Sequence, residues 1–357
     1  MRNGYMLKGK LLKNGYDWWW HSFTAINEKT GEEKPFFIEY FIINPGLSHE
    51  KIIGGKKPSY AMIKAGTWGK SKCQINNFYD PKDFSADKDI MKVKIGNNYA
   101  TETELKGSVS MSDEKAKKKE YMSDSGYIEW DLKAEKVLSY NVGYGASAFF
   151  RTINAFKMYW HVGGMKTLYS GKIIFNGEIY NVIPERSYGY QDKNWGEDYT
   201  NPWVWLNCNN FISVINNKKP QKTSLDIGGG KPVVFGIPLE RKLLMAFYYD
   251  GELYEYNFSK FWKKSKVNFK CTEDTENIYF KIKGENKKSI TEVNFKCSKS
   301  TMIFINYENP KGEKNHKRLW NGGYASGTVK FYKKYKGNRI LIDELMGYMG
   351  GCEYGEY

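Results

Sequence analysis

The feature that most constrains the fold is a rhythm of short alternating stretches that runs along nearly all of the 357 residues. Apolar and polar residues alternate over a few positions, and clusters of Gly, Asn, Asp or Lys separate one stretch from the next. This pattern predicts an all-β protein built from barrels or sandwiches. Helical periodicity is scarce, and the charged stretch 111–121 could form either a short helix or a surface loop. No glycine motif follows a strand and opens a helix, which excludes a dinucleotide-binding α/β fold.

The clearest single element is a hairpin formed by residues 16–27 and 35–44. Side chains alternate between the two faces of a strand, so its first strand has two distinct faces. One face carries Trp18, Trp20, Ser22 and Thr24, and the other carries Trp19, His21, Phe23 and Ala25. In the second strand, Glu39 stands among apolar residues. It could line a pocket as a second acid, but a position on the solvent face of an edge strand is the favoured interpretation.

The length of the chain exceeds that of a usual single core, so two domains are expected. We place them at residues 1–154 and 155–357, with a polar insertion near 97–125 in the first. A hydrophobic content of 41% with 17% aromatic residues supports a real core. No apolar run reaches the length of a membrane span, and the N-terminus lacks the core of a signal peptide. These features predict a soluble, cytoplasmic protein.

The net charge of +15 has two interpretations. The positive charge is nearly all lysine and is spread along the chain, which favours a solvated surface and gives no sign of specific nucleic-acid binding. The alternative is transient contact with an anionic membrane surface, which would suit a lipophilic substrate. The sequence leaves the oligomeric state undetermined.

Cysteine and histidine spacing gives no sign of a disulfide framework or a metal site. No Cys-x-x-Cys pair occurs, and the four histidines lie far apart in the sequence. Free thiols, no metal and no cofactor are therefore expected. The cysteines are Cys73, Cys208, Cys271, Cys297 and Cys352.

The segment 184–211 is the candidate functional region, because it combines many aromatic rings with a few polar groups. Pockets lined by aromatic rings with a few polar groups are typical of sites for apolar ligands. If residues 187–195 are extended, one face carries Tyr188, Tyr190, Asp192 and Asn194, and the other carries Gly189, Gln191, Lys193 and Trp195. By the same rule, a second segment aligns Trp203, Trp205, Asn207 and Asn209.

The segment also offers a plausible acid among aromatic rings. A carboxyl group in apolar surroundings can keep its proton at neutral pH, and aromatic faces stabilise a nearby cation. Asp192 would be the acid and Tyr190 its hydrogen-bond partner. The π surface would come from Trp195, Trp203 and Trp205.

Two motifs in this region resemble the signature of the tocopherol cyclase family. The first is Tyr188-Gly189-Tyr190-Gln191-Asp192-Lys193-Asn194-Trp195-Gly196, and the second is Pro202-Trp203-Val204-Trp205-Leu206-Asn207-Cys208-Asn209. The upstream piece that begins Trp160-His161-Val162-Gly163-Gly164 resembles bacterial members. Asp192 stands where plant members have Glu, and Asn207 stands where they have Gln.

This resemblance implies two lipocalin-like (calycin) β domains and a cofactor-independent proton transfer on a prenylated or polyene lipid. Cyclisation or hydration would each begin with protonation of an alkene. Related carotenoid hydratases imply a third catalytic residue, His161, which could return a proton to the acid or activate a hydroxyl group. The implied substrate-binding residues are Trp160, Tyr188, Asn194, Trp195, Trp203, Trp205, Asn207 and Asn209.

Each candidate also has a structural interpretation. Asp192 could be a turn residue beside a surface lysine, His161 a core histidine, and the tryptophans the filling of a barrel. The rival function is a lipocalin-like binding protein in which an ionised Asp192 pairs with Lys193 or Arg186. A glycan-binding module is a third possibility, and it would place Trp203 and Trp205 on an exposed flat face. The environment of Asp192 distinguishes the enzyme from the binding protein.

Overall fold

The computed structural model describes residues 3–47, 57–140, 153, 155–313 and 318–355. Contacts along the chain divide it into two compact units. The first unit comprises Met1–Tyr144, Lys157–Tyr199 and Ile305–Lys317, and the second comprises Gly145–Phe156, Thr200–Phe304 and Arg318–Tyr357. The expected boundary between residues 154 and 155 touches residue 154, which lies outside the described residues, so it stays a prediction. The candidate segment 184–211 contributes to both units, because the chain passes from the first to the second at residue 199.

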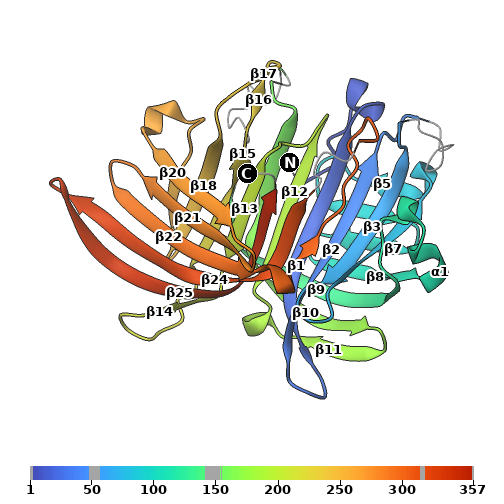
Figure 1. The fold of residues 1–357 in the computed structure, drawn as a ribbon, viewed down its shortest axis with the longest axis horizontal. Helices are drawn as coiled ribbons and strands as arrows, with labels where there is room; N and C mark the ends of the chain where they lie inside the picture. The colour runs from blue at the N-terminus through green and yellow to red at the C-terminus, as the bar shows by residue number, and fades with distance from the viewer. Residues whose placement is uncertain (1–2, 48–56, 141–152, 154, 314–317, 356–357) are drawn as a thin grey trace. The chain divides into compact units, whose positions relative to one another are not determined.

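The first unit contains a twelve-stranded antiparallel sheet (Figure 1). Its strands follow the order β4-β3-β2-β1-β11-β10-β9-β8-β7-β6-β5, and β12 pairs with both β1 and β10. The strands are β1 Tyr16–Asn27, β2 Glu33–Ile43, β3 Tyr60–Thr67, β4 Cys73–Tyr79, β5 Phe84–Ala86, β6 Lys92–Ile95, β7 Asn98–Thr101, β8 Glu104–Met111, β9 Gly126–Tyr140, β10 Met158–Phe175, β11 Glu178–Val182 and β12 Gly189–Gly196. The predicted hairpin of residues 16–27 and 35–44 is thereby confirmed.

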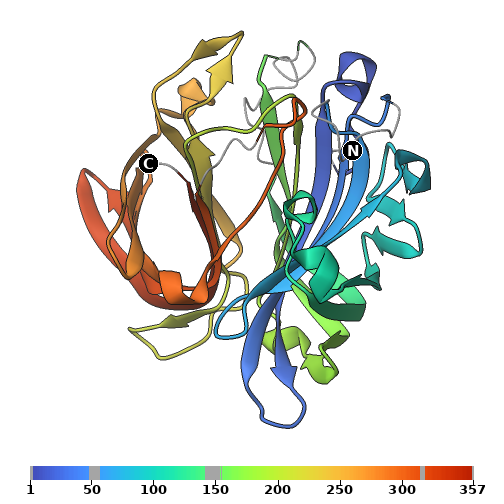
Figure 2. The same ribbon diagram turned by 45° about the vertical axis from the view of Figure 1, so that its right-hand side comes forward.

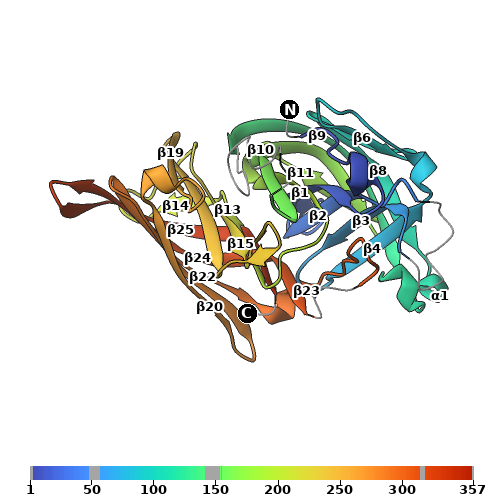
Figure 3. The same ribbon diagram turned by 90° about the horizontal axis from the view of Figure 1, so that it is seen from above.

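The first sheet curls around its own core (Figure 3). Strand β4 contacts β8, so two distant parts of the sheet approach each other. Alternate residues of each strand point into the enclosed side, as the pleat requires. This core includes Trp19, Phe23, Phe36, Ile38, Ile63, Ile75, Leu105, Val109, Trp130, Tyr169 and Ile173.

The stretch near 97–125, expected as a polar insertion, contributes two strands to this sheet. In β8, Leu105 and Val109 are buried in the core while Glu104 and Lys106 are exposed. A strand with one solvated face has few apolar residues, so its composition alone resembles that of a loop. The stretch also contains the short helix α1, Asp113–Ala116, and a 3-10 turn η3, Lys119–Tyr121, so part of 111–121 is helical.

The second unit is an eleven-stranded antiparallel sheet of order β19-β18-β15-β13-β25-β24-β22-β21-β20, to which β14 and β23 add at β25 and β24. Its strands curve round their core, and β18 contacts β20 (Figure 2). The strands are β13 Trp203–Cys208, β14 Phe211–Ser213, β15 Ser224–Gly230, β18 Lys242–Tyr249, β19 Glu252–Tyr256, β20 Lys266–Glu273, β21 Asn277–Glu285, β22 Ser289–Ser298, β23 Ile303–Phe304, β24 Leu319–Tyr335 and β25 Asn338–Gly355. A separate small hairpin pairs β16, Val233–Val234, with β17, Ile237–Pro238.

In the part of the chain that the structure describes, helical structure is confined to short turns, which confirms the all-β prediction. Besides α1 and η3, these are η1 Gly9–Leu12, η2 Pro81–Asp83, η4 Pro184–Arg186, η5 Phe261–Lys263 and η6 Lys299–Thr301. Within the described residues, none of these helices has the length and apolar character needed to cross a bilayer.

Candidate functional site on the first sheet

Strand β12 carries the predicted catalytic residues and lies between β1 and β10. Its register places Asp192 opposite Trp20, and Lys193 opposite Trp19 on β1. Directly opposed residues of an antiparallel pair point to the same side, and neighbours along a strand point to opposite sides. The segment around β12 therefore has two faces with different chemistry. The outer face carries Trp18, Trp20, Trp160, Tyr190, Asp192 and Asn194, and the inner face carries Asp17, Trp19, His21, His161, Gln191, Lys193 and Trp195.

Asp192 is half-buried on the outer face and is held by two neutral donors. Its Oδ2 accepts a hydrogen bond of 2.8 Å from the indole Nε1 of Trp160 and one of 3.3 Å from the hydroxyl group of Tyr190. The structure thus places two of the three predicted catalytic residues, Tyr190 and Asp192, in contact. The interpretation of Asp192 as a turn residue is wrong, because it lies inside strand β12.

Aromatic rings surround this carboxyl group on the same face. Trp20, directly across from Asp192, is 5% exposed and stacks on Phe37 at 5.0 Å between ring centroids. Asn194 is 2% exposed, and its Oδ1 has no hydrogen-bond partner among the described residues. A buried amide oxygen without a partner costs stability unless something else satisfies it. The outer face therefore combines π surface with polar groups that can bind a ligand.

Glu39 also lies on the outer face, and the expectation that it faces solvent is wrong. Strand β2 is flanked by β1 and β3, and the side chains of Glu39 and Lys64 are both fully buried. Their charged atoms are 3.9 Å apart. Lys64 also donates to the carbonyl oxygen of Asn306 at 2.6 Å and lies 3.9 Å from the ring centroid of Tyr307. An apolar sequence context gave no sign that the strand is central rather than at an edge.

The inner face holds a buried ion pair between Lys193 and Asp17. Lys193 also lies 3.8 Å from the ring centroid of Trp19, and the backbone N–H of Met6 donates to Asp17 Oδ2 at 2.8 Å. Burial raises the pKa of Asp17 to about 6, although Lys193 opposes the change. Burial lowers the pKa of Lys193 to about 8, against the effect of Asp17. Lys193 is therefore a core residue, so the alternative interpretation that made it a surface lysine is wrong.

A second polar group lies deeper on the inner face. His21 Nδ1 is 2.9 Å from the hydroxyl oxygen of Tyr169, and its Nε2 has no hydrogen-bond partner among the described residues. Burial, followed by the positive charge of Lys136, lowers the pKa of His21 to about 3. Burial raises the pKa of Tyr169 well above its ordinary value. His21 is therefore neutral at physiological pH.

The remaining predicted residues of the first unit lie on the face opposite Asp192 or outside strand β12. His161 is 6% exposed and is opposed to Lys193, which places it on the inner face. Trp195 is also on the inner face, as predicted, where it stacks on Tyr159 at 5.3 Å. Tyr188 precedes β12 with a φ of 45°, so it does not continue the extended segment. The predicted catalytic trio is thus divided between the two sides of one sheet.

The second predicted segment belongs to the second unit. Trp203 Nε1 donates to Glu353 at 2.7 Å, and Trp205 Nε1 donates to Asp226 at 3.1 Å. Asn207 donates to the carbonyl oxygen of Leu225 at 3.0 Å. The two tryptophans are 6% and 4% exposed, which argues against a flat glycan-binding face. The fourth residue of this set, Asn209, is 4% exposed and follows β13.

Two features of the site were not found from the sequence. The residues that face Asp192 and Asn194, namely Trp20 and Trp18, were placed on one face of their strand but were not connected with β12. The pair between Lys193 and Asp17 joins residues 176 positions apart. Only the pairing of β1 with β12 brings these groups together. All five cysteines are buried, and none of them is joined to another by a disulfide.

Sequence comparisons find two similar plant proteins. It matches a chloroplastic protein of Oryza sativa subsp. japonica named a probable tocopherol cyclase, with 26% identity over 144 residues, which are 39% of this chain and 27% of that protein. It matches the chloroplastic tocopherol cyclase of Zea mays with 28% identity over 102 residues, which are 28% of this chain and 20% of that one. The chain thus matches about a quarter of the length of these curated relatives.

Solved structures share the lipocalin-like fold. A protein of Nitrosomonas europaea described as a putative AttH aligns with a TM-score of 0.50 and 11% identity over 96% of this chain and 92% of its own. CghA, solved with Sch210972, aligns with a TM-score of 0.51 and 10% identity over 99% and 94% of the two chains. The model of the family described as tocopherol cyclase-like matches residues 54–356. The chain belongs to the tocopherol cyclase-like family.

Proposed function

We propose that this protein is a proton-transfer enzyme that cyclises or hydrates an alkene in a prenylated or polyene lipid, with Asp192 as its acid. The observation that carries the proposal is the position of Asp192 between Trp160 and Tyr190 on a strongly aromatic face. Family membership supports the class of chemistry. The identity of the lipid is left open.

The reaction needs one acid that also acts as the final base. Asp192 gives its proton to one carbon of the alkene, whose π electrons form the new C–H bond and leave a carbocation on the other carbon. A hydroxyl group of the substrate, or a water molecule, then donates an electron pair to that carbocation. The oxonium group loses its proton to the Asp192 carboxylate, so the enzyme returns to its starting state. The net change is an isomerisation in one case and a hydration in the other.

Each neighbour of Asp192 has a role in this scheme. Oδ2 accepts both hydrogen bonds, so an acid form with its proton on Oδ1 can keep them. The indole rings of Trp160 and Trp20 can stabilise the carbocation by about 2 kcal/mol or more where water is excluded. The amide oxygen of Asn194, which is buried on the same face, can accept a hydrogen bond from the substrate's hydroxyl group.

The cations that a pure binding protein was expected to use are engaged elsewhere. Lys193 pairs with Asp17 on the opposite side of the sheet, and Arg186 pairs with Glu33 at 2.7 Å. Neither cation therefore neutralises Asp192. The two pairings that were expected of a binding protein are therefore not the ones that the structure has.

A binding protein without catalysis is the second candidate, and one observation favours it. Two neutral donors on Oδ2 stabilise a carboxylate more than a neutral acid. An ionised Asp192 could anchor a hydroxyl group of an apolar ligand without transferring a proton. The two functions predict different lipids in the purified protein.

Mass spectrometry of co-purifying lipids tests the proposal by comparing the wild type with Asp192→Asn. We expect the wild type to retain a lipid together with its isomerised or hydrated form. Asp192→Asn should keep the lipid and lose the converted form, because Asn cannot donate a proton. Asp131→Asn, at an exposed surface pair with Lys106, is the control and should match the wild type. Equal conversion by Asp192→Asn would exclude Asp192 as the acid, and an unconverted lipid in every variant would favour the binding protein.

A further inference from the structure

A small hairpin of the second unit presents apolar side chains to solvent. It spans residues 231–242 and contains β16 and β17, joined by a turn at Phe235 and Gly236. Phe235 is 63% exposed, Ile237 65% and Leu239 37%. Single exposed apolar residues are ordinary on protein surfaces, but three of them within five positions at the end of a hairpin form a patch.

The turn itself is unfavourable for the residue that occupies it. Phe235 has a φ of 48° and Gly236 a φ of 80°, as in a two-residue turn that normally takes Asn-Gly or Gly-Gly. A bulky side chain in the left-handed region costs about 1–2 kcal/mol. The chain thus keeps a large aromatic ring at an exposed position where a small polar residue would be more stable. Strain of this kind often marks a functional position.

Backbone contacts hold the hairpin at its turn. The N–H of Phe235 donates to the carbonyl oxygen of Ala155 at 2.9 Å, and the N–H of Leu239 donates to that of Pro232 at 2.8 Å. Val234 forms a bridge with Phe156. These contacts satisfy the backbone while they leave the side chains of Phe235 and Ile237 in solvent.

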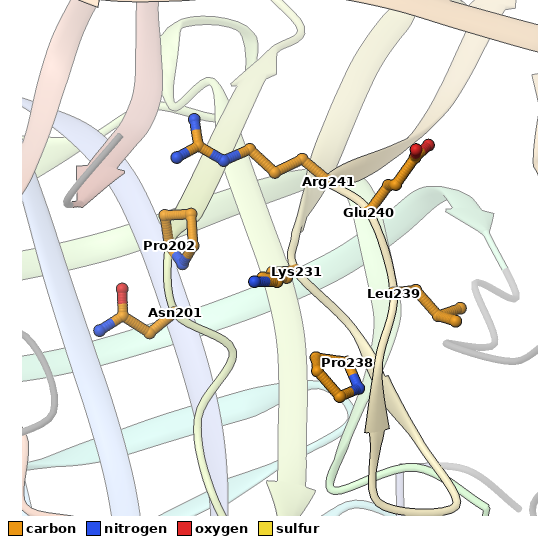
Figure 4. Close-up of a pocket in the computed structure, with 7 residues that line it drawn as sticks. All are labelled: Asn201, Pro202, Lys231, Pro238, Leu239, Glu240 and Arg241. Carbon is orange, nitrogen blue, oxygen red and sulfur yellow. The ribbon is translucent and has the colours of Figure 1, made fainter.

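Cations lie at the base of the hairpin. Lys231, Arg241 and Lys242 lie at the two ends of the hairpin, against the single carboxylate of Glu240. Lys231 and Arg241 line a surface hollow of about 840 Å³ together with Asn201, Pro202, Pro238, Leu239 and Glu240. Figure 4 shows both cationic side chains directed toward Asn201 and Pro202, while Glu240 points to the other side.

We propose that this hairpin docks the protein on an anionic phospholipid bilayer. Phe235 and Ile237 enter the boundary between headgroups and acyl chains, and Lys231 and Arg241 contact the phosphate groups. An apolar tip flanked by cations is the pattern of interfacial membrane anchors. A hairpin tip is too small for a stable protein interface, which takes about 800 Å² from each partner. A bilayer needs only a few such anchors.

This inference does not depend on the proposed reaction. It concerns the surface through which the protein binds a bilayer, and it holds whether the Asp192 site is catalytic or only binds a ligand. The lysines spread along the chain add a general attraction to anionic surfaces, but they do not determine which part of the protein contacts the bilayer. We assign that contact to the hairpin.

Sedimentation with lipid vesicles tests the docking surface. The wild type should bind vesicles of phosphatidylcholine mixed with phosphatidylglycerol, and it should bind vesicles of phosphatidylcholine alone more weakly. The double variant Phe235→Ser/Ile237→Ser should lower the partition coefficient at least about tenfold, because two apolar anchors are lost. Lys231→Gln and Arg241→Gln should each lower it about fivefold and reduce its sensitivity to salt.

A matched control separates this surface from general stickiness. Ile215 lies in another loop of the second unit, is 59% exposed and has Lys218 and Lys219 nearby in the sequence. Ile215→Ser should bind like the wild type. The backbone amides of 233–239 should exchange hydrogen more slowly when vesicles are present. No binding by the wild type, or an equal loss in Ile215→Ser and in the hairpin variant, would overturn the proposal. Asp192→Asn should bind vesicles as the wild type does, so a failure here leaves the proposed reaction untouched.

Discussion

Asp192 and Lys193 are neighbours on one strand, yet the two faces of the sheet give them opposite environments. Lys193 is 1% exposed and pairs with the fully buried Asp17 on the inner face. Asp192 is half-buried on the outer face and accepts hydrogen bonds from an indole and a phenol. A step of one residue along β12 is enough to place a side chain on the opposite face of the sheet.

The comparison distinguishes charged groups that stabilise the fold from a carboxyl group that is proposed to react. Each charge of a buried ion pair is stabilised by the other, so removal of either member leaves an isolated charge in the core. Asp192 lies on the face that carries the aromatic rings and accepts hydrogen bonds from Trp160 and Tyr190. The inner face therefore fixes the position of β12, and the outer face presents the reactive group. Three measurements can break or sharpen this distinction.

The largest effect is expected for Lys193→Met. The substitution leaves Asp17 in the core without its cation, so the free energy of unfolding should fall by about 3–5 kcal/mol. Denaturant unfolding at neutral pH measures the change. The double variant Asp17→Asn/Lys193→Met removes both charges and should recover most of the loss. A loss below about 1 kcal/mol in the single variant would mean that the pair does not support the fold.

An intermediate effect is expected in the pH dependence of stability. In the folded protein the pKa of Asp17 rises from 3.8 to about 6, so the native state binds more protons than the unfolded chain between these values. Stability from this group is complete below about pH 4 and is lost as pH rises through 6. The pKa of Lys193 falls from 10.5 to about 8, so the stability it contributes rises again from pH 8 to pH 10.5.

The contribution of the pair should therefore be lowest between pH 6 and 8. The difference in unfolding free energy between the wild type and Asp17→Asn/Lys193→Met should change by up to about 3 kcal/mol on either side of that range. His21, whose pKa is lowered to about 3, has the opposite slope between pH 3 and 6.5. It is present in both proteins, so its effect cancels in the difference. A difference independent of pH would contradict the assignment.

The smallest effect is expected on the outer face. Trp160→Phe removes one neutral donor from Asp192 and should cost about 1 kcal/mol of unfolding free energy. Thermal unfolding of this variant beside Lys193→Met gives the ratio of the two effects. A larger cost for Trp160→Phe than for Lys193→Met would reverse the roles assigned to the two faces.

Local features of the fold could be predicted from the sequence. The alternation in β1 assigned Trp18 and Trp20 to one face and Trp19 and His21 to the other, and the structure has the same division. The faces of β12 followed in the same way. These predictions hold because the pleat forces a period of two on any strand.

The contacts between strands could not be predicted. Glu39 was expected at the surface because nothing local shows that β2 has a strand on both sides. His161 was grouped with Asp192 because the two share a sequence region, but the register with Lys193 places it on the other face. The period of two says which residues share a face but not which strands adjoin.

The sequence alone determined that this chain forms strands, which side chains alternate along them, and which segment carries an acid among aromatic rings. The tertiary structure decided that Lys193 pairs with Asp17, 176 residues away, and that Asp192 accepts a hydrogen bond from Trp160. The physical reason is that alternation is a property of one strand, whereas pairing depends on the order in which distant strands close a sheet.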